Sequence, residues 1–322
     1  MITRHQFNGA EAFAAMLSQV NGDVVQYGRI DPSKQGTRWT EWSCTTAPLP
    51  HGAVTHFTSA GPLAGTGRTQ ADQVVLLMPW MDRIPHVYRG VEMPPNGAAF
   101  FGPNAEYAGK CDADHAFTVF VLSAERVNNY LAHILEPDSI PVPGSYLPTD
   151  LPENLRSELE TLVGQLLEME GVEDSPFANE AVRARFEERV LNVIGEMVSL
   201  HKKQPLEDKP RHEARMKLVN ECWDLARREA NVNLTLEDLC MGTNASPRVL
   251  QYAFEEMTGT SPLVFLRNHR LHKARRLLLG DVETVKESAY SCGFPELGRF
   301  SKYYRDLFGE NPSETLAGRV GS

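Results

Sequence analysis

The spacing of hydrophobic positions divides the chain into a strand-like first part and a helical second part. Between residues 20 and about 125, short runs rich in β-branched and aromatic residues alternate with Gly- and Pro-rich turns, a composition typical of strands. The runs are Val24–Tyr27, Thr37–Trp42, Val54–Phe57, Val74–Met78 and Phe117–Leu122. We expect residues 1–140 to form a small antiparallel β domain, either a sandwich or a partly open barrel. The tripeptide Gly65-Thr66-Gly67 is interpreted as a loop.

Residues 150–200 carry hydrophobic positions at helical spacing. Two stripes repeat every three or four residues, which predicts a hairpin of two amphipathic helices with a bend at residues 170–176. The stripes are Leu155, Leu159, Leu162, Leu166 and Met169, and Phe186, Val190, Val193, Met197 and Leu200. Two interpretations remain open, and both can be true. In one, the hairpin packs on the β domain of its own chain. In the other, it forms a dimer interface through all of these side chains except Met169 and Leu200.

A polar segment with two prolines, residues 201–210, is expected to link the two parts of the chain. Beyond it, residues 211–322 contain two similar helix-turn-helix patterns in series, at 234–262 and 283–314. One such pattern is a weak signal, because many helix pairs share a short turn. Two patterns in tandem predict two recognition helices held at a set distance, as successive major grooves of DNA require.

The first unit has the local signals of two short helices around a tight turn. Thr235 and Asp238 suit a capping box, and Gly242-Thr243-Asn244 suits the turn, since Gly and Asn tolerate positive φ. Ser246 then caps a second helix, with Pro247 in its first turn. Helical spacing turns one set of residues toward the core, namely Leu250, Phe254 and Met257. It turns another set outward, namely Arg248, Gln251 and Tyr252.

The second unit repeats this logic. Thr284 and Glu287 suit a capping box, Gly293 suits the turn, and Pro295 is expected to open the last long helix. The apolar stripe of that helix consists of Phe300, Tyr304, Leu307 and Phe308. A different face carries Glu296, Arg299 and Lys302.

A basic helix, from about Ser261 to Leu279, connects the units. Eighteen residues at about 1.5 Å each give a length of about 27 Å, slightly short of the roughly 34 Å between successive major grooves. The protein is therefore expected to fit best on DNA bent toward it. Arg267, Arg270 and Lys273 are candidate phosphate contacts; a solvated helix face is the alternative interpretation.

This part contains several short motifs, namely S-P-x-x-L-x-x-x-F from Ser246, T-G-x-S-P from Thr258, R-x-x-x-A-R-x-L-L from Arg270, G-F at Gly293, F-S at Phe300 and F-G-x-x-P from Phe308. Together they resemble the AraC/XylS family of transcriptional regulators. The resemblance spans about residues 234–316. The wording V-K-E-S-A and G-F-P-E-L-G-R-F is also similar to the branch that includes the ethanolamine-operon regulator.

The resemblance implies a fold and a function. The expected fold class is α+β, with a cupin-like antiparallel β domain and a helical hairpin, then an all-α domain with two helix-turn-helix motifs. The cupin-like domain would sense a small-molecule effector or mediate dimerisation. The expected function is sequence-specific binding of promoter DNA, with activation by contact with RNA polymerase; repression is equally compatible with these residues.

The resemblance also implies base-reading positions. It places Arg248, Gln251 and Tyr252 against base edges or nearby backbone, and Arg and Gln can bond guanine and adenine bidentately. In the second unit it points to a set in which polar base readers are partly replaced, namely Leu297, Gly298 and Lys302. Strong base reading is therefore not expected from this helix; Arg299 and Lys302 are expected to hold phosphates, and Leu297 to touch a thymine methyl.

The charge distribution limits how DNA is bound. The chain has a net charge of −10, but residues 211–322 contain 16 Lys and Arg against 15 Asp and Glu. Because this domain is close to neutral, affinity is expected to come from local patches and from a homodimer on double-stranded DNA. An architectural DNA-binding protein without sequence preference, one alternative function, would carry a far more basic domain.

The remaining residues do not form a catalytic or metal-binding pattern, so we expect no enzyme, cofactor or metal. His51 and His56 lack the H-x-H spacing of a metal cupin, no G-x-S-x-G motif is present, and five scattered cysteines suit reduced thiols. An enzyme with an appended DNA-binding domain is the other alternative. Trp39, Trp42 and Trp80 are candidates for lining an effector pocket, with core packing as the alternative. The absence of an apolar run of eighteen residues and of a signal segment predicts a cytoplasmic protein without membrane contact.

Overall fold

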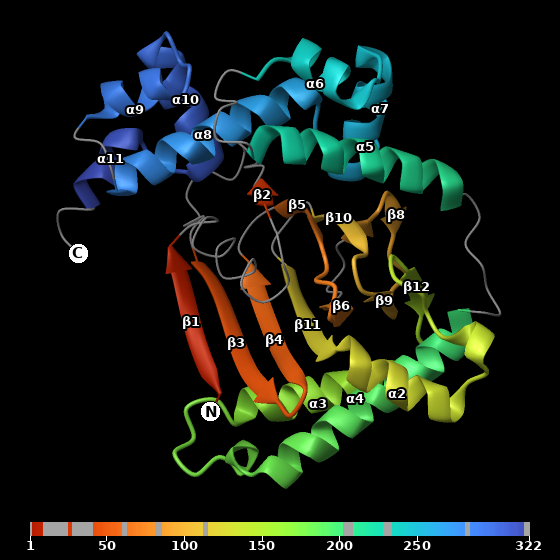
Figure 1. The fold of residues 1–322 in the computed structure, drawn as a ribbon. Coiled ribbons are helices and arrows are strands. Elements are labelled where there is room, and N and C mark those ends of the chain that lie inside the picture. The colour runs from red at the N-terminus through yellow and green to blue at the C-terminus, as the bar shows by residue number, and fades with distance from the viewer. Residues whose placement is uncertain are drawn as a thin grey trace.

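The computed structural model describes residues 2–8, 25–27, 41–59, 63–80, 86–111, 115–201, 209–227, 234–280 and 284–318. All strand pairings in these ranges are antiparallel. A β domain and a helical hairpin precede a domain made only of helices (Figure 1). The predicted α+β fold class is confirmed.

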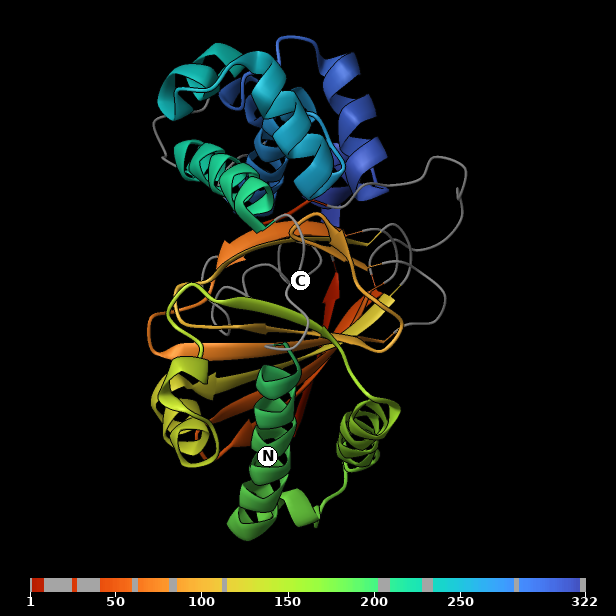
Figure 2. The ribbon, with the colours of Figure 1, turned by 90° about the vertical axis from the view of Figure 1, so that its right-hand side faces the viewer.

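The β domain consists of two antiparallel sheets, here named sheet A and sheet B, that lie one above the other (Figure 2). Sheet A has the order β1 (Thr3–Asn8), β3 (Glu41–Leu49), β4 (Gly52–Ser59), β11 (His115–Ser123), β6 (Gln73–Trp80), β9 (Gly97–Phe101) and β12 (Tyr146–Asp150). Sheet B has the order β2 (Val25–Tyr27), β5 (Leu63–Arg68), β10 (Glu106–Cys111), β7 (His86–Tyr88) and β8 (Val91–Glu92).

Alternate side chains of β6 show that the two faces of sheet A belong to two different cores. Val74, Leu76 and Met78 belong to the core that sheet A shares with the helical hairpin. Val75 belongs to the core between the two sheets, together with Tyr88 of sheet B. Since successive side chains of a strand point to opposite faces, an almost unbroken apolar run such as β6 is expected where both faces are buried.

The predicted strands are found in the described residues, with two corrections. β2, β4, β6 and β11 match four of the runs, and only the end of Thr37–Trp42 is described, as the start of β3. The interpretation of Gly65–Gly67 as a loop is wrong, because these residues lie in β5 between β2 and β10, where Gly65 pairs with Gly109. The β domain also extends past the predicted boundary at residue 140, since β12 pairs with β9 at the edge of sheet A.

The helical hairpin packs on its own β domain, as one of the two interpretations expects, and a dimer interface stays a prediction. Helices α3 (Glu153–Glu168) and α4 (Glu180–His201) lie with α2 (Ala124–Ile134) against the outer face of sheet A (Figure 2). The predicted interface residues are buried in that core or, for Leu155, partly buried against it: Leu155, Leu159, Leu162, Leu166, Phe186, Val190, Val193 and Met197. Exposing one such side chain costs about 1.5–3 kcal/mol, so a second chain could bind them only at that cost.

The helical domain is built around two cores that share one helix. Its helices are α5 (Lys209–Arg227), α6 (Leu236–Thr243), α7 (Pro247–Thr258), α8 (Pro262–Gly280), α9 (Val285–Ser291), α10 (Leu297–Phe308) and α11 (Pro312–Gly318). Phe265 and Leu266 of α8 pack with α5, α6 and α7, whereas Leu271, Ala274 and Leu278 pack with α9 and α10. The two helix-turn-helix units are therefore joined through a continuous helix.

The two domains meet at sheet B. Ala108 of β10 is fully buried and belongs to the same core as residues of α5 and α7. Most of the predicted linker, residues 202–208, lies outside the described residues. Within the described helices, none has the length and apolar character needed to cross a membrane.

Candidate nucleic-acid interface

The first helix-turn-helix unit is shaped by caps at each helix end. Thr235 Oγ1 accepts a hydrogen bond from the Asp238 N–H at 3.2 Å, and Asp238 Oδ2 accepts one from the Thr235 N–H at 2.8 Å, which completes a capping box. Asn244 ends α6 in the left-handed conformation at φ 51°. Ser246 then accepts a hydrogen bond from the Val249 N–H at 3.4 Å and starts α7. These local signals fix the angle between the two helices.

The outward face of α7 presents the three side chains that the sequence predicted. Arg248 and Tyr252 are exposed and Gln251 is half-buried, while the opposite face of the helix is fully buried in the core. Arg248 donates a hydrogen bond to the Tyr252 hydroxyl at 3.2 Å, and Gln251 donates one to Glu255 Oε1 at 2.5 Å. The structure thus brings Arg248 and Tyr252 together as one exposed pair.

The second unit presents a different kind of surface. Thr284 caps α9 by accepting a hydrogen bond from the Glu287 N–H at 3.1 Å, and Gly293 takes a φ of 73° in the turn. Helix α10 begins at Leu297, two residues later than the predicted start, because the backbone at Glu296 is extended.

The four predicted residues of α10 are not equivalent. Leu297 is half-buried against the core of the second unit, whereas Gly298, Arg299 and Lys302 are exposed. A Cβ at Gly298 would meet no atom within 4 Å, so this position leaves open space beside the start of the helix. Arg299 forms an exposed ion pair with Glu296 at 3.1 Å. The exposed surface of α10 therefore carries two cations, Arg299 and Lys302, near Gly298.

Two of the three candidate phosphate contacts on helix α8 pack against aromatic rings. Arg267 lies over the ring of Tyr303 at 4.5 Å, and Arg270 lies over Phe294 at 5.2 Å and donates to the Gly293 carbonyl at 3.4 Å. Burial lowers the pKa of Arg270. These two guanidinium groups pack on side chains of the second unit, and their role as phosphate contacts stays a prediction. The third candidate, Lys273, is half-buried.

The two units lie near the two ends of α8, on the side away from the sheets (Figure 1). At about 1.5 Å per residue, the 19 residues of α8 span about 28 Å. Arg248 and Tyr252 lie in the first half of α7, and the other end of this helix, at Met257, lies against Gly90 of the β domain. Docking on the β domain thus leaves Arg248 and Tyr252 exposed.

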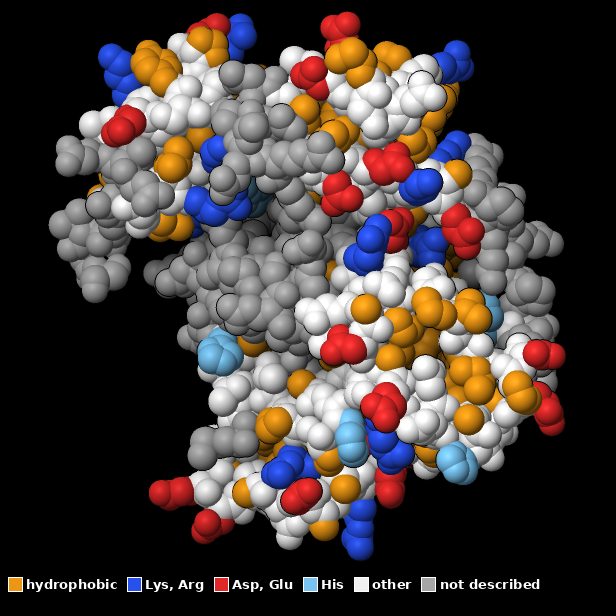
Figure 3. Space-filling model, viewed as in Figure 1, with side chains coloured by type: hydrophobic (Ala, Val, Ile, Leu, Met, Phe, Trp, Pro, Cys, Tyr) orange, Lys and Arg blue, Asp and Glu red, His pale blue; other side chains and the backbone are white. Residues whose placement is uncertain are grey.

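Charge on this domain is mixed. Figure 3 shows Lys and Arg side chains interspersed with Asp and Glu over the helices on the face that it draws. This agrees with the near-equal counts of 16 and 15 for residues 211–322. Any attraction to phosphates must therefore be local.

The cysteine thiols and the possible metal ligands of the described residues form no reactive site. Cys44, Cys111, Cys222 and Cys292 are buried, and burial raises the pKa of Cys222 to about 12 and that of Cys292 to about 11. The thiols of Cys222 and Cys292 therefore lack the lowered pKa of a nucleophile. In the described part of the chain, no group of three His, Cys, Asp or Glu residues is placed to hold a metal ion.

The predicted tryptophan pocket is tested for one residue only. Trp80 is half-buried against the core of sheet A and the hairpin, and its indole N–H donates to Thr118 Oγ1 at 2.8 Å. Trp39 and the side chain of Trp42 lie outside the described residues. A cavity that sequence patterns did not predict lies elsewhere, between the β domain and α5.

Comparison with known proteins places the similarity in the helical domain. A family model described as a helix-turn-helix domain matches residues 239–318. The "XylDLEGF operon transcriptional activator 2" of Pseudomonas putida is 40% identical over 94 residues, which are 28% of this chain and 60% of that protein. The "HTH-type transcriptional activator RhaS" of Escherichia fergusonii is 39% identical over 77 residues, 24% of this chain and 28% of that protein. This chain thus spans less than two thirds of either activator.

A solved structure, titled a "probable AraC family transcriptional regulator" from Rhodopseudomonas palustris, is 39% identical to this chain. The match covers 32% of this chain and 97% of that one, with a TM-score of 0.30. The narrower resemblance to the ethanolamine-operon regulator stays a prediction.

Proposed function

We propose that this chain, a regulator of the AraC/XylS family by its helix-turn-helix domain and its similarity to the Pseudomonas putida activator, binds promoter DNA sequence-specifically and activates transcription. Helices α7 and α10 enter adjacent major grooves on one side of the duplex. The observation that carries this proposal is the single helix α8, whose halves belong to the cores of two units with outward-facing helices. Paired readers on a rigid spacer match the repeat of the major groove.

In this proposal α7 reads bases. Arg248 pairs with guanine and Gln251 with adenine, and each bidentate pair discriminates by about 1–3 kcal/mol. To reach the bases, Arg248 must exchange its bond to the Tyr252 hydroxyl, and the half-buried Gln251 must exchange its bond to Glu255. The specificity of the complex then comes mainly from the first unit.

Helix α10 positions the protein instead. The open space at Gly298 lets the DNA backbone approach the start of the helix, and Arg299 and Lys302 neutralise phosphates on either side. Contacts to phosphates fix register without reading sequence. Leu297 keeps one side in the core, so only its exposed part can reach a thymine methyl.

Dimerisation, effector control and contact with RNA polymerase complete the proposal. The length of α8, about 28 Å, is short of the roughly 34 Å groove repeat, which favours DNA bent toward the protein. The nearly neutral helical domain favours binding as a homodimer, which doubles the phosphate contacts. Because the apolar stripes of the hairpin are buried in one chain, such a dimer must use other surfaces.

Footprinting and gel-shift assays on the protein's own upstream region test this function. We expect Arg248→Ala to cost about 1–3 kcal/mol on the operator and to relax one base position. Lys302→Ala should weaken binding to all sequences alike, because a phosphate contact carries no sequence information. Arg4→Ala, at an exposed ion pair with Glu170, is the charge-matched control and should change nothing. Equal affinity of the wild type for operator and random DNA at physiological salt would refute the proposal.

A further inference from the structure

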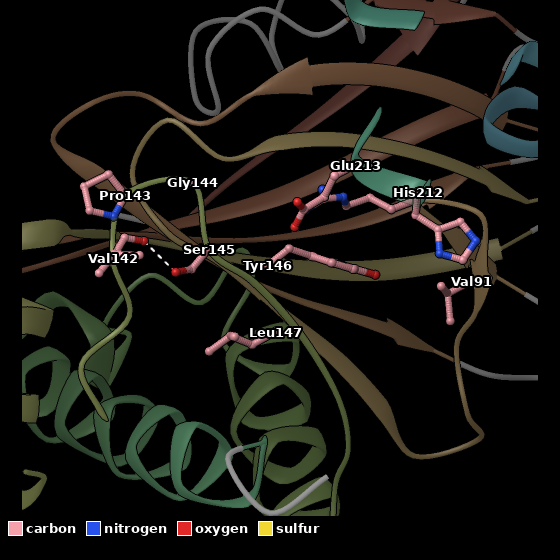
Figure 4. A pocket seen from close by; sticks show the side chains of 10 residues that line it. Val91, Val142, Pro143, Gly144, Ser145, Tyr146, Leu147, His212 and Glu213 are labelled. Atoms are coloured by element: carbon pink, nitrogen blue, oxygen red, sulfur yellow. Dashed lines mark hydrogen bonds between the residues drawn. The ribbon is translucent and has the colours of Figure 1, made fainter. Parts of the chain in front are cut away.

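A cavity of about 320 Å³ lies between the two domains (Figure 4). Its walls are the turn between β7 and β8, the segment 142–147 that leads into β12, and the first turns of α5. Ligand sites commonly have volumes of about 300–1,000 Å³, so this cavity suits a molecule of few heavy atoms. Both domains contribute residues, so an occupant would touch both.

Arg89 is a cation built into the wall of this cavity. It is only 7% exposed, and its N–H is held by the Ala108 carbonyl at 2.7 Å. The guanidinium lies over the ring of Tyr146 at 4.8 Å, and Tyr146 donates its hydroxyl to the Tyr88 carbonyl at 3.3 Å. Among the described residues, the Arg89 side chain forms no hydrogen bond or ion pair. The carboxylates of Glu213 and Glu106 attract this guanidinium from beyond ion-pair distance, and its planar fork suits a carboxylate that bonds it directly.

The wall formed by α5 carries a negative charge, that of Glu213. Glu213 projects from α5 toward the segment with Ser145 and Tyr146 (Figure 4), and it forms no ion pair with Arg89 within the described chain. A ligand bearing only a negative charge would be repelled by this carboxylate. A ligand that carries both charges would satisfy both walls at once.

We propose that this cavity binds a small zwitterion of the α-amino-acid type. Its carboxylate accepts hydrogen bonds from Arg89, and its ammonium group faces Glu213. Apolar lining from Val91, Val142 and Leu147 leaves room for an aliphatic side chain.

The site is connected to the first recognition helix. His212, beside Glu213 on α5, forms an ion pair with Glu256 of α7 at 3.2 Å. In the turn beside Arg89, a Cβ at Gly90 would lie 2.9 Å from the Met257 side chain of α7. A ligand that joins Arg89 to Glu213 therefore stabilises the arrangement in which α7 is docked on the β domain. Regulation by this route rests on the proposed DNA-binding function.

Calorimetric titration of the full chain, with L-leucine and L-valine as probes, tests the site without DNA. We expect saturable binding and a rise in the midpoint of thermal unfolding. The single-charge analogues 4-methylpentanoate and 3-methylbutylamine should bind at least ~10-fold more weakly, because each lacks one charge-assisted hydrogen bond.

Two variants locate the binding to this cavity. Arg89→Gln and Glu213→Gln should each weaken leucine at least ~10-fold, while Glu221→Gln, further along α5, should leave it unchanged. Since Glu213 is exposed, its variant folds even if the buried Arg89 variant does not.

Three results would each overturn the proposal. They are no binding of either amino acid at millimolar concentration, binding of 4-methylpentanoate as tight as that of leucine, and a Glu213→Gln variant that binds like the wild type. A gel shift with and without leucine then tests regulation separately. Leucine binding with no operator binding refutes the DNA-binding function alone, and leucine binding with unchanged operator affinity refutes the regulatory link alone.

Discussion

The contact of Ala108 with the helical domain makes a sharp prediction about how the two domains are held together. Ala108 is fully buried on β10, in the same core as Met216 of α5 and Phe254 of α7. Ala108→Glu places a carboxylate in these apolar surroundings. The residues of that cluster are all apolar.

The magnitudes decide what the variant does. An unpaired buried carboxylate costs several kcal/mol, a large part of the 5–15 kcal/mol that stabilise a typical domain. Moving the domains apart gives up the Ala108 methyl, worth about 0.8 kcal/mol, and contacts such as that of Gly90 with Met257, but it leaves the core of each domain closed. Met216 and Phe254 keep their contacts with each other after separation, since they belong to the core of the first helix-turn-helix unit. We therefore expect the domains to separate while each stays folded.

Small-angle X-ray scattering provides the assay. The variant should have a larger radius of gyration than the wild type, an unchanged circular dichroism spectrum and two separate thermal transitions. Glu106→Gln, two residues away on β10 and paired with Arg68 on the β domain itself, is the control and should scatter like the wild type. A variant with the wild-type scattering curve and one cooperative transition would show that the contact at Ala108 does not hold the domains together.

Three further predictions concern the β domain. Leu159→Glu should unfold the chain rather than dissociate a dimer, whereas the exposed Val172→Glu should be tolerated; urea unfolding that depends on protein concentration would contradict this. Glu187→Gln should lower the free energy of unfolding by about 1.5–3 kcal/mol, because the buried carboxylate accepts hydrogen bonds from Arg126 and from the β3–β4 turn. An unchanged midpoint of chemical denaturation would count against this reason. Burial lowers the pKa of His56 to about 4, so the unfolded state binds more protons between pH 6.5 and 4. Stability should fall by about 2 kcal/mol from pH 7.5 to 5, and His56→Gln should flatten that dependence; equal slopes for the two proteins would refute it.

Features with local causes were predictable from sequence. The capping residues Thr235 and Ser246 and the turn residue Asn244 act within a few positions of the chain, and the structure places each as expected. The helical stripes of the hairpin were also predictable, but their partner was not. An apolar face looks the same whether it packs on a sheet or on a second chain.

Features that depend on residues far apart in the chain could not be predicted from the sequence. β5 contains two glycines, which carry no strand preference, and it is a strand because β2 and β10 bond to both its edges. In the sequence, Arg267 and Arg270 look like phosphate contacts. Only the structure shows that they lie over the rings of Tyr303 and Phe294. The interdomain cavity has no sequence signature, since its residues come from three separate parts of the chain.

The anchoring of each half of α8 in a separate core has a consequence for which length changes the chain can tolerate. One inserted residue would shift the second unit by only about 1.5 Å but turn it by about 100° about the axis of α8. The inserted copy could not relax by local fraying, because the cores on both sides of it are closed. Helix α8 therefore sets the rotation of one unit relative to the other more than the distance between them. Single insertions or deletions within it should be selected against far more strongly than substitutions.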